Sequence, residues 1–164
     1  MKKNFWKKKK VLITGHTGFT GTWITSLLLL LKCNIVGISL KPNSKLRIDK
    51  NREVKKRVKN YYFDIREESK LKKIVIKENP DIVIHLAAQS LVGEGINFPS
   101  KTFTTNINGT INLLDSLRGC LRLKSIIIFT TDKVYRNLEK KICLKKMILW
   151  VAMILIHQVK HLKN

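Results

Sequence analysis

The stretch VLITGHTGFTGTW, Val11 to Trp23, decides the fold of this chain. Four apolar, strand-like residues run into three glycines spaced three apart, Gly15, Gly18 and Gly21. A turn without side chains lets the backbone approach a pyrophosphate, and the next helix offers N–H groups and the positive end of its dipole. The alternative is a tight strand-to-helix turn with no ligand. The position of the glycines between a first strand and a first helix favours dinucleotide binding.

Around this turn, short apolar runs alternate with longer helical segments. The pattern predicts strands at Val11–Thr14, Asn34–Leu40, Asn60–Phe63, Ile82–Leu86 and Ser125–Phe129. It predicts helices at Gly18–Leu31, Glu67–Glu78 and Thr102–Leu117. Such alternation with nearly continuous apolar strands indicates βαβ units and right-handed crossovers. We therefore expect an α/β fold, a doubly wound parallel sheet of Rossmann type, truncated after about the fifth strand.

The charge balance of the chain is extreme. Its 164 residues suffice for one domain with a real core, and they carry a net charge of +22. Such a charge suits a nucleic-acid-binding protein. The lysines are scattered, however, with clusters only at Lys7–Lys10 and around Lys55–Lys59, and no nucleic-acid-binding motif accompanies them. We favour a drift of surface composition and expect no nucleic-acid partner, with the basic nucleic-acid-binding protein as the alternative.

Cysteine spacing and apolar run length bound the cellular setting. Cys33, Cys120 and Cys143 are far apart and form no CxxC pair, which is typical of buried thiols in a reducing compartment rather than of a metal site. The apolar runs Leu27–Leu31 and Met147–Ile156 fall short of the roughly 20 residues that span a bilayer. We therefore expect a cytoplasmic protein with no metal and no membrane partner.

The ends of the first two predicted strands bear on the choice of cofactor. The residues expected to line the glycine turn are Thr14, His16, Thr17 and Phe19. The second strand ends near Lys41 and has no acid there for an adenosine ribose. Because a lysine at that place suits a 2′-phosphate, the residues alone leave both NAD and NADP open.

Three later sites are also candidates for cofactor contact: one after the third predicted strand, one at the end of the fourth, and one within the last predicted helix. Asp64 and Ile65 can place a carboxylate near an adenine amino group, or Asp64 can cap the next helix. The run HLAAQ at 85–89 has the small residues that a cofactor lying across strand ends needs, or it packs tightly without one. Asn106 lies on an otherwise apolar helix face, where a satisfied core amide is the commoner case.

The segment 130–133, TTDK, closes the fifth predicted strand at its carboxyl end, where open α/β sheets place their chemistry. Asp132 and Lys133 are adjacent there, so each can shift the pKa of the other and the two can serve as proton donor and acceptor. An exposed ion pair is the alternative.

Together these motifs resemble the extended short-chain dehydrogenase/reductase family and, within it, the CDP-glucose 4,6-dehydratases. The matching segments are NFW at 4–6, VLITGHTGFTGTW at 11–23, DIR at 64–66, PDIVIHLAAQSLV at 80–92, TNINGTINLLD at 105–115 and TTDKVY at 130–135. The Asp132-Lys133 pair is informative, since the related dTDP-glucose dehydratases usually carry Asp-Glu there. The resemblance covers about Lys3 to Asn137.

The resemblance implies an NAD-dependent lyase that converts CDP-glucose to CDP-4-keto-6-deoxyglucose, in a family whose members are usually homo-oligomeric. NAD is then expected despite Lys41. Thr131 would hydrogen-bond the C4 oxygen, Asp132 would protonate the departing C6 hydroxyl, and Lys133 would assist proton removal at C5. The residues that would bind the cofactor are Gly15, Thr17, Gly18, Phe19, Gly21, Asp64, Ile65, Leu86, Ala87, Ala88 and Asn106, the last at the family's structural asparagine.

The end of the chain departs from the family pattern. The family uses a Tyr-x-x-x-Lys pair, but Tyr135 is followed at that spacing by Glu139. Read from the third base of each codon, Met147-Ile148 and Met153-Ile154 each force Asp and Trp150-Val151 forces Gly, where the family carries NDPLGGYDPYSSSKA.

We therefore expect 1–137 to be a partial NAD-binding domain, 138–164 to be out of frame, and the C-terminal substrate domain to be absent. Such a truncated chain would be inactive. A native C-terminal helix is the alternative for the tail, and a dinucleotide-binding module without catalysis is the alternative for the function.

Overall fold

A computed structural model describes residues 3–42 and 57–130. They lie almost wholly in one compact unit, Met1–Ile128, and only the first two residues of a second unit, Phe129–Asn164, are described. The strands are β1 (Lys10–Thr14), β2 (Asn34–Ser39), β3 (Val58–Tyr62), β4 (Ile82–His85) and β5 (Ser125–Ile128). The helices are α1 (Lys3–Trp6), α2 (Phe19–Leu30), α4 (Glu68–Glu78), α5 (Val92–Asn97), α6 (Pro99–Phe103), the π-helix η2 (Thr104–Asn108) and α7 (Gly109–Leu117).

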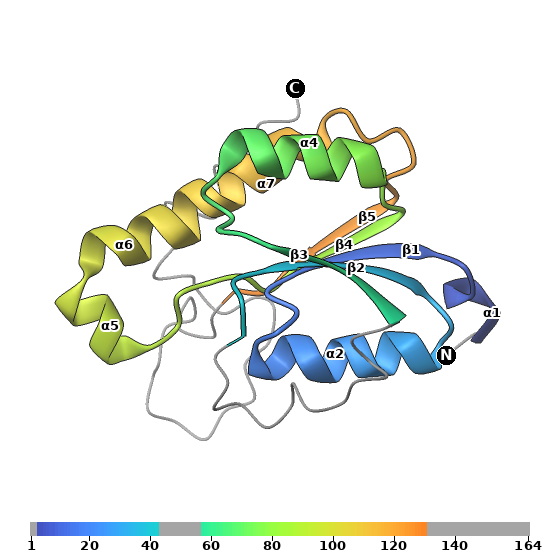
Figure 1. Cartoon of the computed structure of the whole chain (residues 1–164), viewed down its shortest axis with the longest axis horizontal. Helices are drawn as coiled ribbons and strands as arrows, with labels where there is room; N and C mark the ends of the chain where they lie inside the picture. The colour runs from blue at the N-terminus through green and yellow to red at the C-terminus, as the bar shows by residue number, and fades with distance from the viewer. Residues whose placement is uncertain (1–2, 43–56, 131–164) are drawn as a thin grey trace, which may run out of the picture. The chain divides into compact units, whose positions relative to one another are not determined.

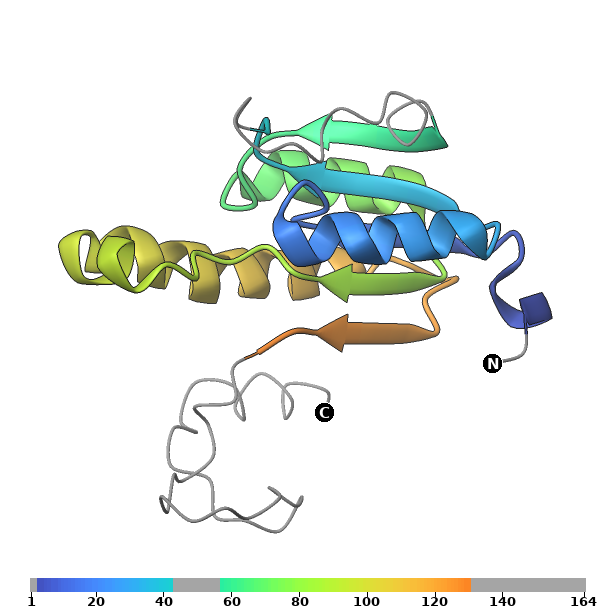
Figure 2. The ribbon, with the colours of Figure 1, turned by 90° about the horizontal axis from the view of Figure 1, so that it is seen from below.

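These strands form one parallel sheet in the order β3-β2-β1-β4-β5. β1 pairs with β2 from Lys10 to Thr14 and with β4 from Val11 onward. The chain therefore moves outward from β1 in one direction and then returns to continue in the other, which creates a switch point between β1 and β4. Figure 2 shows the carboxyl ends of the strands at one edge of the sheet. The expected doubly wound parallel sheet is confirmed.

Helices cover both faces of the sheet, α2 on one and α4 with α7 on the other (Figure 1). The core under α2 consists of Val11, Ile13, Leu28, Leu29, Cys33, Ile35, Val58, Ile82 and Ile84. The core under α4 and α7 consists of Leu12, Val36, Ile38, Phe63, Ile65, Leu71, Val75, Val83, Leu113, Leu117 and Cys120. Residues 11–13 of β1 and 82–84 of β4 are apolar because helices bury both faces of these strands.

The helical segment from Pro99 to Leu117 differs from the single regular helix expected at Thr102–Leu117. It begins three residues earlier, and its middle is the π-helix, where the Gly109 N–H bonds the Thr104 carbonyl five residues back. No prediction was made for α1 or α5, and the predicted third strand begins two residues too late and ends one residue too late. The other boundaries agree with the prediction within one residue.

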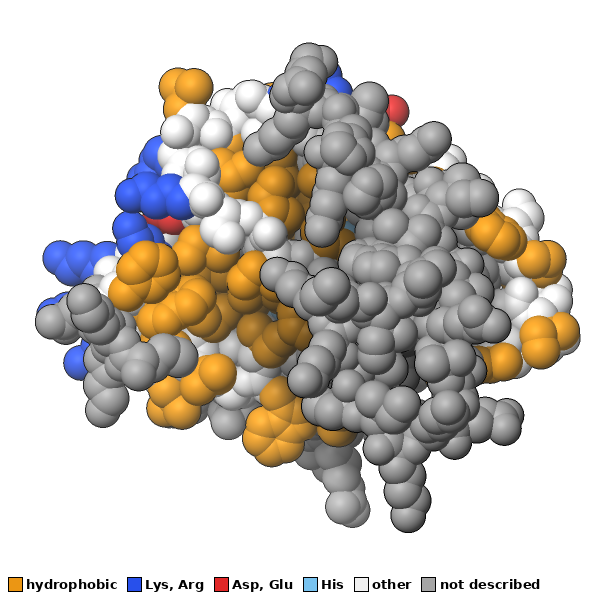
Figure 3. Space-filling model, turned by 180° about the vertical axis from the view of Figure 1, so that it is seen from behind, with side chains coloured by type: hydrophobic (Ala, Val, Ile, Leu, Met, Phe, Trp, Pro, Cys, Tyr) orange, Lys and Arg blue, Asp and Glu red, His pale blue; other side chains and the backbone are white. Residues whose placement is uncertain are grey.

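The outer side of α2 is as apolar as its core-facing side. Phe19, Trp23, Leu27 and Leu30 follow one another at helical spacing, and all four are exposed. Hydrophobic side chains also gather beside Lys and Arg on the side of the molecule seen in Figure 3. Of the helices formed by residues 3–42 and 57–130, none has both the length and the apolar character required to cross a bilayer.

Candidate functional site

The glycine turn joins β1 to α2 at the switch point of the sheet, and packing requires two of its glycines. Gly15 has a positive φ of 72°, and a Cβ there would lie 2.8 Å from the Ala87 amide nitrogen. A Cβ on Gly21 would collide with the carbonyl oxygen of Gly15. Among the described residues, a Cβ on Gly18 would meet only that same oxygen, at 3.3 Å. The turn thus lies directly against the end of β4.

α2 begins at this turn with its amide groups uncapped by side chains. Gly18 is the N-cap residue and has no side chain that could cap the helix, and the first turn of the helix has no acid. Phe19, the first residue of the helix, is largely exposed. Because the first turn of α2 holds no acid that would offset the dipole, the amide groups and the dipole together favour an anion such as a pyrophosphate.

Two side chains of the turn bind the neighbouring strands. The Thr17 hydroxyl donates to Ser39 Oγ at the end of β2, at 3.0 Å. His16 is buried, its Nε2 lies 2.8 Å from Asn60 Oδ1 on β3, and its ring stacks on Tyr62. The expectation that His16 lines the turn is therefore wrong. Its side chain points into the sheet and fixes the turn from beneath.

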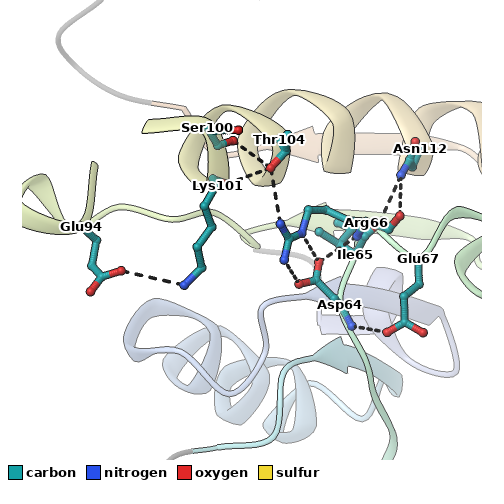
Figure 4. A network of polar contacts seen from close by, with 9 residues as sticks. All are labelled: Asp64, Ile65, Arg66, Glu67, Glu94, Ser100, Lys101, Thr104 and Asn112. Atoms are coloured by element: carbon teal, nitrogen blue, oxygen red, sulfur yellow. Dashed lines mark hydrogen bonds and ion pairs between the residues drawn. The ribbon is translucent and has the colours of Figure 1, made fainter. Parts of the chain in front are cut away.

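Asp64 and Ile65 follow β3 but point in different directions. Arg66 donates from Nη2 and Nε to the two carboxylate oxygens of Asp64, at 2.7 and 3.0 Å (Figure 4). These bonds hold the pKa of Asp64 below its usual range, so the carboxylate is ionised and keeps spare acceptor capacity. Asp64 does not cap α4, whose N-cap is Glu67. Ile65 is buried beneath Gly109.

The segment after β4 lies beside the glycine turn, where Leu86 and Ala87 are half-buried and Ala88 is exposed. The side chain of Asn106, from the π-helix, forms two hydrogen bonds with the backbone of Gln89, the residue after Ala88. Its Oδ1 accepts from the Gln89 N–H at 2.7 Å, and its Nδ2 donates to the Gln89 carbonyl at 3.0 Å. The amide of Asn106 is thus satisfied by backbone, which fastens the segment at its far end.

The catalytic candidates Thr131, Asp132 and Lys133 lie outside the described residues, as do Tyr135 and the segment 138–164. They follow β5, whose carboxyl end is at the same edge of the sheet as the glycine turn.

Cys33 and Cys120 are buried free thiols, and burial raises the pKa of both. Within residues 3–42 and 57–130, no three His, Cys, Asp or Glu side chains are grouped so that they could hold a metal ion.

Comparison with known proteins adds to this geometry. The model of the GDP-mannose 4,6 dehydratase family matches residues 12–146, most of the chain. The chain belongs to the GDP-mannose 4,6 dehydratase family. It is 34% identical over 137 residues to the CDP-glucose 4,6-dehydratase of Salmonella typhimurium and 32% identical over 134 residues to the CDP-paratose 2-epimerase of Salmonella typhi. The expected resemblance to nucleotide-sugar dehydratases is confirmed.

These alignments cover 84% and 80% of the chain but only 38% and 39% of the two relatives. Among solved structures, the UDP-glucose 4-epimerase of Bifidobacterium longum in complex with NAD+ and UDP superposes with a TM-score of 0.74 at 26% identity. That match covers 87% of this chain and 43% of the epimerase. This member of the GDP-mannose 4,6 dehydratase family thus spans about two fifths of the length of the relatives it matches.

Sequence reasoning missed two residues at the site of this GDP-mannose 4,6 dehydratase family member. His85 stood in the run HLAAQ, but only the small residues of that run were interpreted. Thr110 had no assigned role. The structure joins them by a hydrogen bond of 2.9 Å between His85 Nε2 and Thr110 Oγ1. A polar residue ending an otherwise apolar strand was the signal that could have identified His85.

Proposed function

We propose that this chain is the NAD-binding part of a nucleotide-sugar dehydratase whose substrate is CDP-glucose. The observation that carries the proposal is the glycine turn, where Gly15 and Gly21 allow close packing and Gly18 leaves the start of α2 open and uncapped. An anionic pyrophosphate fits that place by charge and by space. The Salmonella dehydratase named above supports the reaction class and the sugar nucleotide.

Different residues around the turn would contact different parts of the cofactor. The pyrophosphate would lie on the turn from Gly15 to Phe19. Asp64, kept ionised by Arg66, would accept a hydrogen bond from the adenine amino group. The segment Leu86–Ala88 would lie under the nicotinamide half, since the small side chains of Ala87 and Ala88 leave room there. Lys41 at the end of β2 is exposed, and we propose NAD rather than NADP on the family resemblance.

When bound, NAD supplies a hydride acceptor for sugar C4 and later a hydride donor for C6. We assign the remaining steps to the residues that follow β5. Thr131 donates a hydrogen bond to the C4 oxygen, Asp132 protonates the departing C6 hydroxyl, and Lys133 assists removal of the C5 proton. A general acid and an assisting base on consecutive residues suit the loss of water across C5 and C6.

We also propose that the segment 138–164 is out-of-frame translation, and that the chain as written binds NAD without completing the dehydration. The support is the spacing from Tyr135 to Glu139, which provides no Tyr-x-x-x-Lys pair, and the forced codon overlaps after Met147. Sequencing of the source DNA across the codons for 139–164 tests this. A restored frame that continues into Tyr-Ser-Ser-Ser-Lys is expected, and downstream frames without that string would overturn the assignment.

NAD binding is tested with a pair of matched glycine variants. Gly18→Asp places a carboxylate at the start of α2 with one tight Cβ contact, 3.3 Å to the Gly15 carbonyl oxygen, whereas Gly93→Asp places one where no atom of the described residues lies within 4 Å. Calorimetric titration should give at least about a tenfold weaker NAD affinity for Gly18→Asp because of charge repulsion. Gly93→Asp should bind like the parent chain, and the parent chain should prefer NAD to NADP. Equal affinities for all three proteins, or no binding by the parent, would contradict the proposal.

A further inference from the structure

A chain of polar side chains crosses the sheet at the carboxyl end of β4. His85, the last residue of β4, is 3% exposed and pairs in register with Thr14, the last residue of β1. The two ring nitrogens of His85 have different partners. Nδ1 lies 2.6 Å from Thr14 Oγ1, and Nε2 lies 2.9 Å from Thr110 Oγ1 on α7. The imidazole therefore bridges the strand that carries the glycine turn and the helix that follows the π-helix.

The other bonds of the two hydroxyls assign the proton on the ring. Thr14 Oγ1 accepts from the Ala87 N–H at 3.2 Å and also from the Leu86 N–H, which it shares with the Thr14 carbonyl. Its one proton is thus free to go to His85 Nδ1. Thr110 Oγ1 donates its proton to the Asn106 carbonyl at 2.7 Å, so it accepts from His85 Nε2. The ring is neutral, with its hydrogen on Nε2.

This chain of bonds fastens both ends of the segment Leu86–Gln89. Thr14 binds the amide groups at its start, and Asn106 holds the backbone of Gln89 on both sides. The same segment leaves no space for a Cβ at Gly15. A shift of a few tenths of an ångström in the segment would therefore be transmitted to the glycine turn.

We propose that His85 is a positioning residue for the dinucleotide site: as a neutral bridge from Thr14 to Thr110, it sets the segment Leu86–Gln89 against the glycine turn. This inference rests on the proposed binding of NAD. The residues that face the ring from β1, β5 and α7 are Thr14, Ile128 and Thr110, and none of them is charged. Burial alone lowers the pKa of His85 to about 4, which keeps the bridge neutral near pH 7.

Protonation would break the bridge in a defined way. An imidazolium carries hydrogens on both nitrogens, so Nδ1 would donate to Thr14 Oγ1 instead of accepting from it. A hydroxyl oxygen has two acceptor positions, and the Leu86 and Ala87 amides already use them. One of these amides would be displaced, and the segment would loosen beside the glycine turn.

The chain offers a matched pair of variants to test this. Thr110→Val removes the acceptor of His85 Nε2, whereas Ser116→Ala removes a hydroxyl on the same helix that makes the same kind of bond, to the Asn112 carbonyl at 2.6 Å. We expect Thr110→Val and His85→Leu to weaken NAD binding by about tenfold, with the loss of one buried hydrogen bond. Ser116→Ala should change it less than about twofold, and His85→Gln, which keeps a donor and an acceptor, should recover most of the affinity.

A spectroscopic measurement tests the bridge without any cofactor. In long-range 1H–15N spectra of the full chain with labelled histidines, the signal that disappears in His85→Gln should show the Nε2–H form at pH 7. It should not titrate between about pH 5 and pH 8. A charged ring or the Nδ1–H form would overturn the inference, as would unchanged NAD affinity in both Thr110→Val and His85→Leu.

The failure of the proposed function gives a different result from the failure of this inference. If the parent chain does not bind NAD, the proposed function falls, and hydrogen exchange at the amides of Ala87 and Gln89 then decides the inference. Faster exchange in Thr110→Val and His85→Leu, but not in Ser116→Ala, supports the positioning role. Equal exchange in all of these proteins overturns it.

Discussion

The two edges of the sheet are held together by different chemistry. At the amino edge, buried carboxylates take cationic and polar partners. Glu78 is 3% exposed and accepts from the Tyr61 hydroxyl at 2.7 Å and the Lys59 ammonium at 2.6 Å. Asp81 is 4% exposed and accepts from Arg122 Nη2 at 3.2 Å. Burial pushes the pKa of both carboxyls upward, but these partners, together with the Lys10 N–H that donates to Asp81 Oδ2 at 2.8 Å, outweigh it and lower both values.

At the centre of the carboxyl edge, the bonds of Thr14, His85, Thr110 and Asn106 are all between neutral groups. A fixed charge there would compete with the phosphates of a dinucleotide for the same amide groups, whereas a neutral network leaves those groups available. The paired charges of the amino edge therefore secure the fold, while the neutral network at the centre of the carboxyl edge shapes the candidate site.

The largest effect is expected at the carboxyl edge, from Gly21→Ala. The added Cβ would collide with the Gly15 carbonyl oxygen, so the backbone of the turn must move. The free energy of unfolding, measured by urea titration, should fall by about 3 kcal/mol or more, and NAD binding should be lost. The control Gly93→Ala meets no atom within 4 Å in the part of the chain that the structure describes, and it should leave both nearly unchanged. Similar losses in both variants would show that the turn is not tightly packed.

The next largest effect should come from Glu78→Ala at the amino edge. It leaves the Tyr61 hydroxyl and the Lys59 ammonium without their shared acceptor, and the free energy of unfolding should fall by about 2 to 3 kcal/mol. The NAD affinity of the folded protein should not change, because Glu78 is at the opposite edge from the turn. Glu68→Ala, at the exposed start of the same helix, serves as control. A weakened NAD affinity in Glu78→Ala would break the proposed division between the edges.

The pH dependence of stability separates the edges further. His85 binds a proton near its ordinary pKa of 6.5 when unfolded but only near 4 when folded. Its contribution is therefore complete above about pH 6.5 and is lost as the pH falls toward 4, about 2 kcal/mol between pH 7 and pH 5. The lowered pKa values of Glu78 and Asp81 act in a lower window, because their contributions are lost only as the pH falls through those values.

Urea titrations at pH 7 and pH 5 should therefore show that the free energy of unfolding falls less between the two pH values in His85→Gln than in the parent chain. An equal fall in the free energy of unfolding in both proteins would mean that the imidazole is not kept neutral by burial in the folded chain.

The smallest effect should come from an exposed ion pair. Arg118 Nε, from the C-cap residue of α7, and Asp115 Oδ1 are 3.1 Å apart, with more than half of each side chain in solvent. Arg118→Ala should change the free energy of unfolding by less than about 0.5 kcal/mol, since solvent screens such a pair. Thermal unfolding at low and high salt checks this. A loss comparable to that of Glu78→Ala would mean that burial does not determine how much an ion pair contributes to stability.

The sequence predicted what depends on neighbouring residues. The apolar run before Gly15 and the spacing of Gly15, Gly18 and Gly21 are local patterns, so the strand, the turn and the start of α2 were placed within one residue. The position of Asp64 after β3 was equally local. Its bond to Arg66, two residues on, belongs to the same short motif.

What the sequence did not predict depends on contacts between distant segments. Glu78 meets Lys59 only because α4 ends beside the start of β3, and His85 meets Thr110 only because α7 crosses the end of β4. The π-helix adds a residue to one turn, so helical spacing beyond it no longer continues the earlier face. Phe103, for example, is exposed before the π-helix, whereas Leu117 is buried after it.

The burial of His16 has an evolutionary consequence. Its ring occupies the space above Gly37, where a Cβ would lie 2.6 Å from the imidazole. Gly37→Ala should be harmful in this background but tolerated once position 16 is small, so the two substitutions are epistatic. Homologues are therefore expected to vary at 16 and 37 together, with any side chain at one position limiting the size of the other.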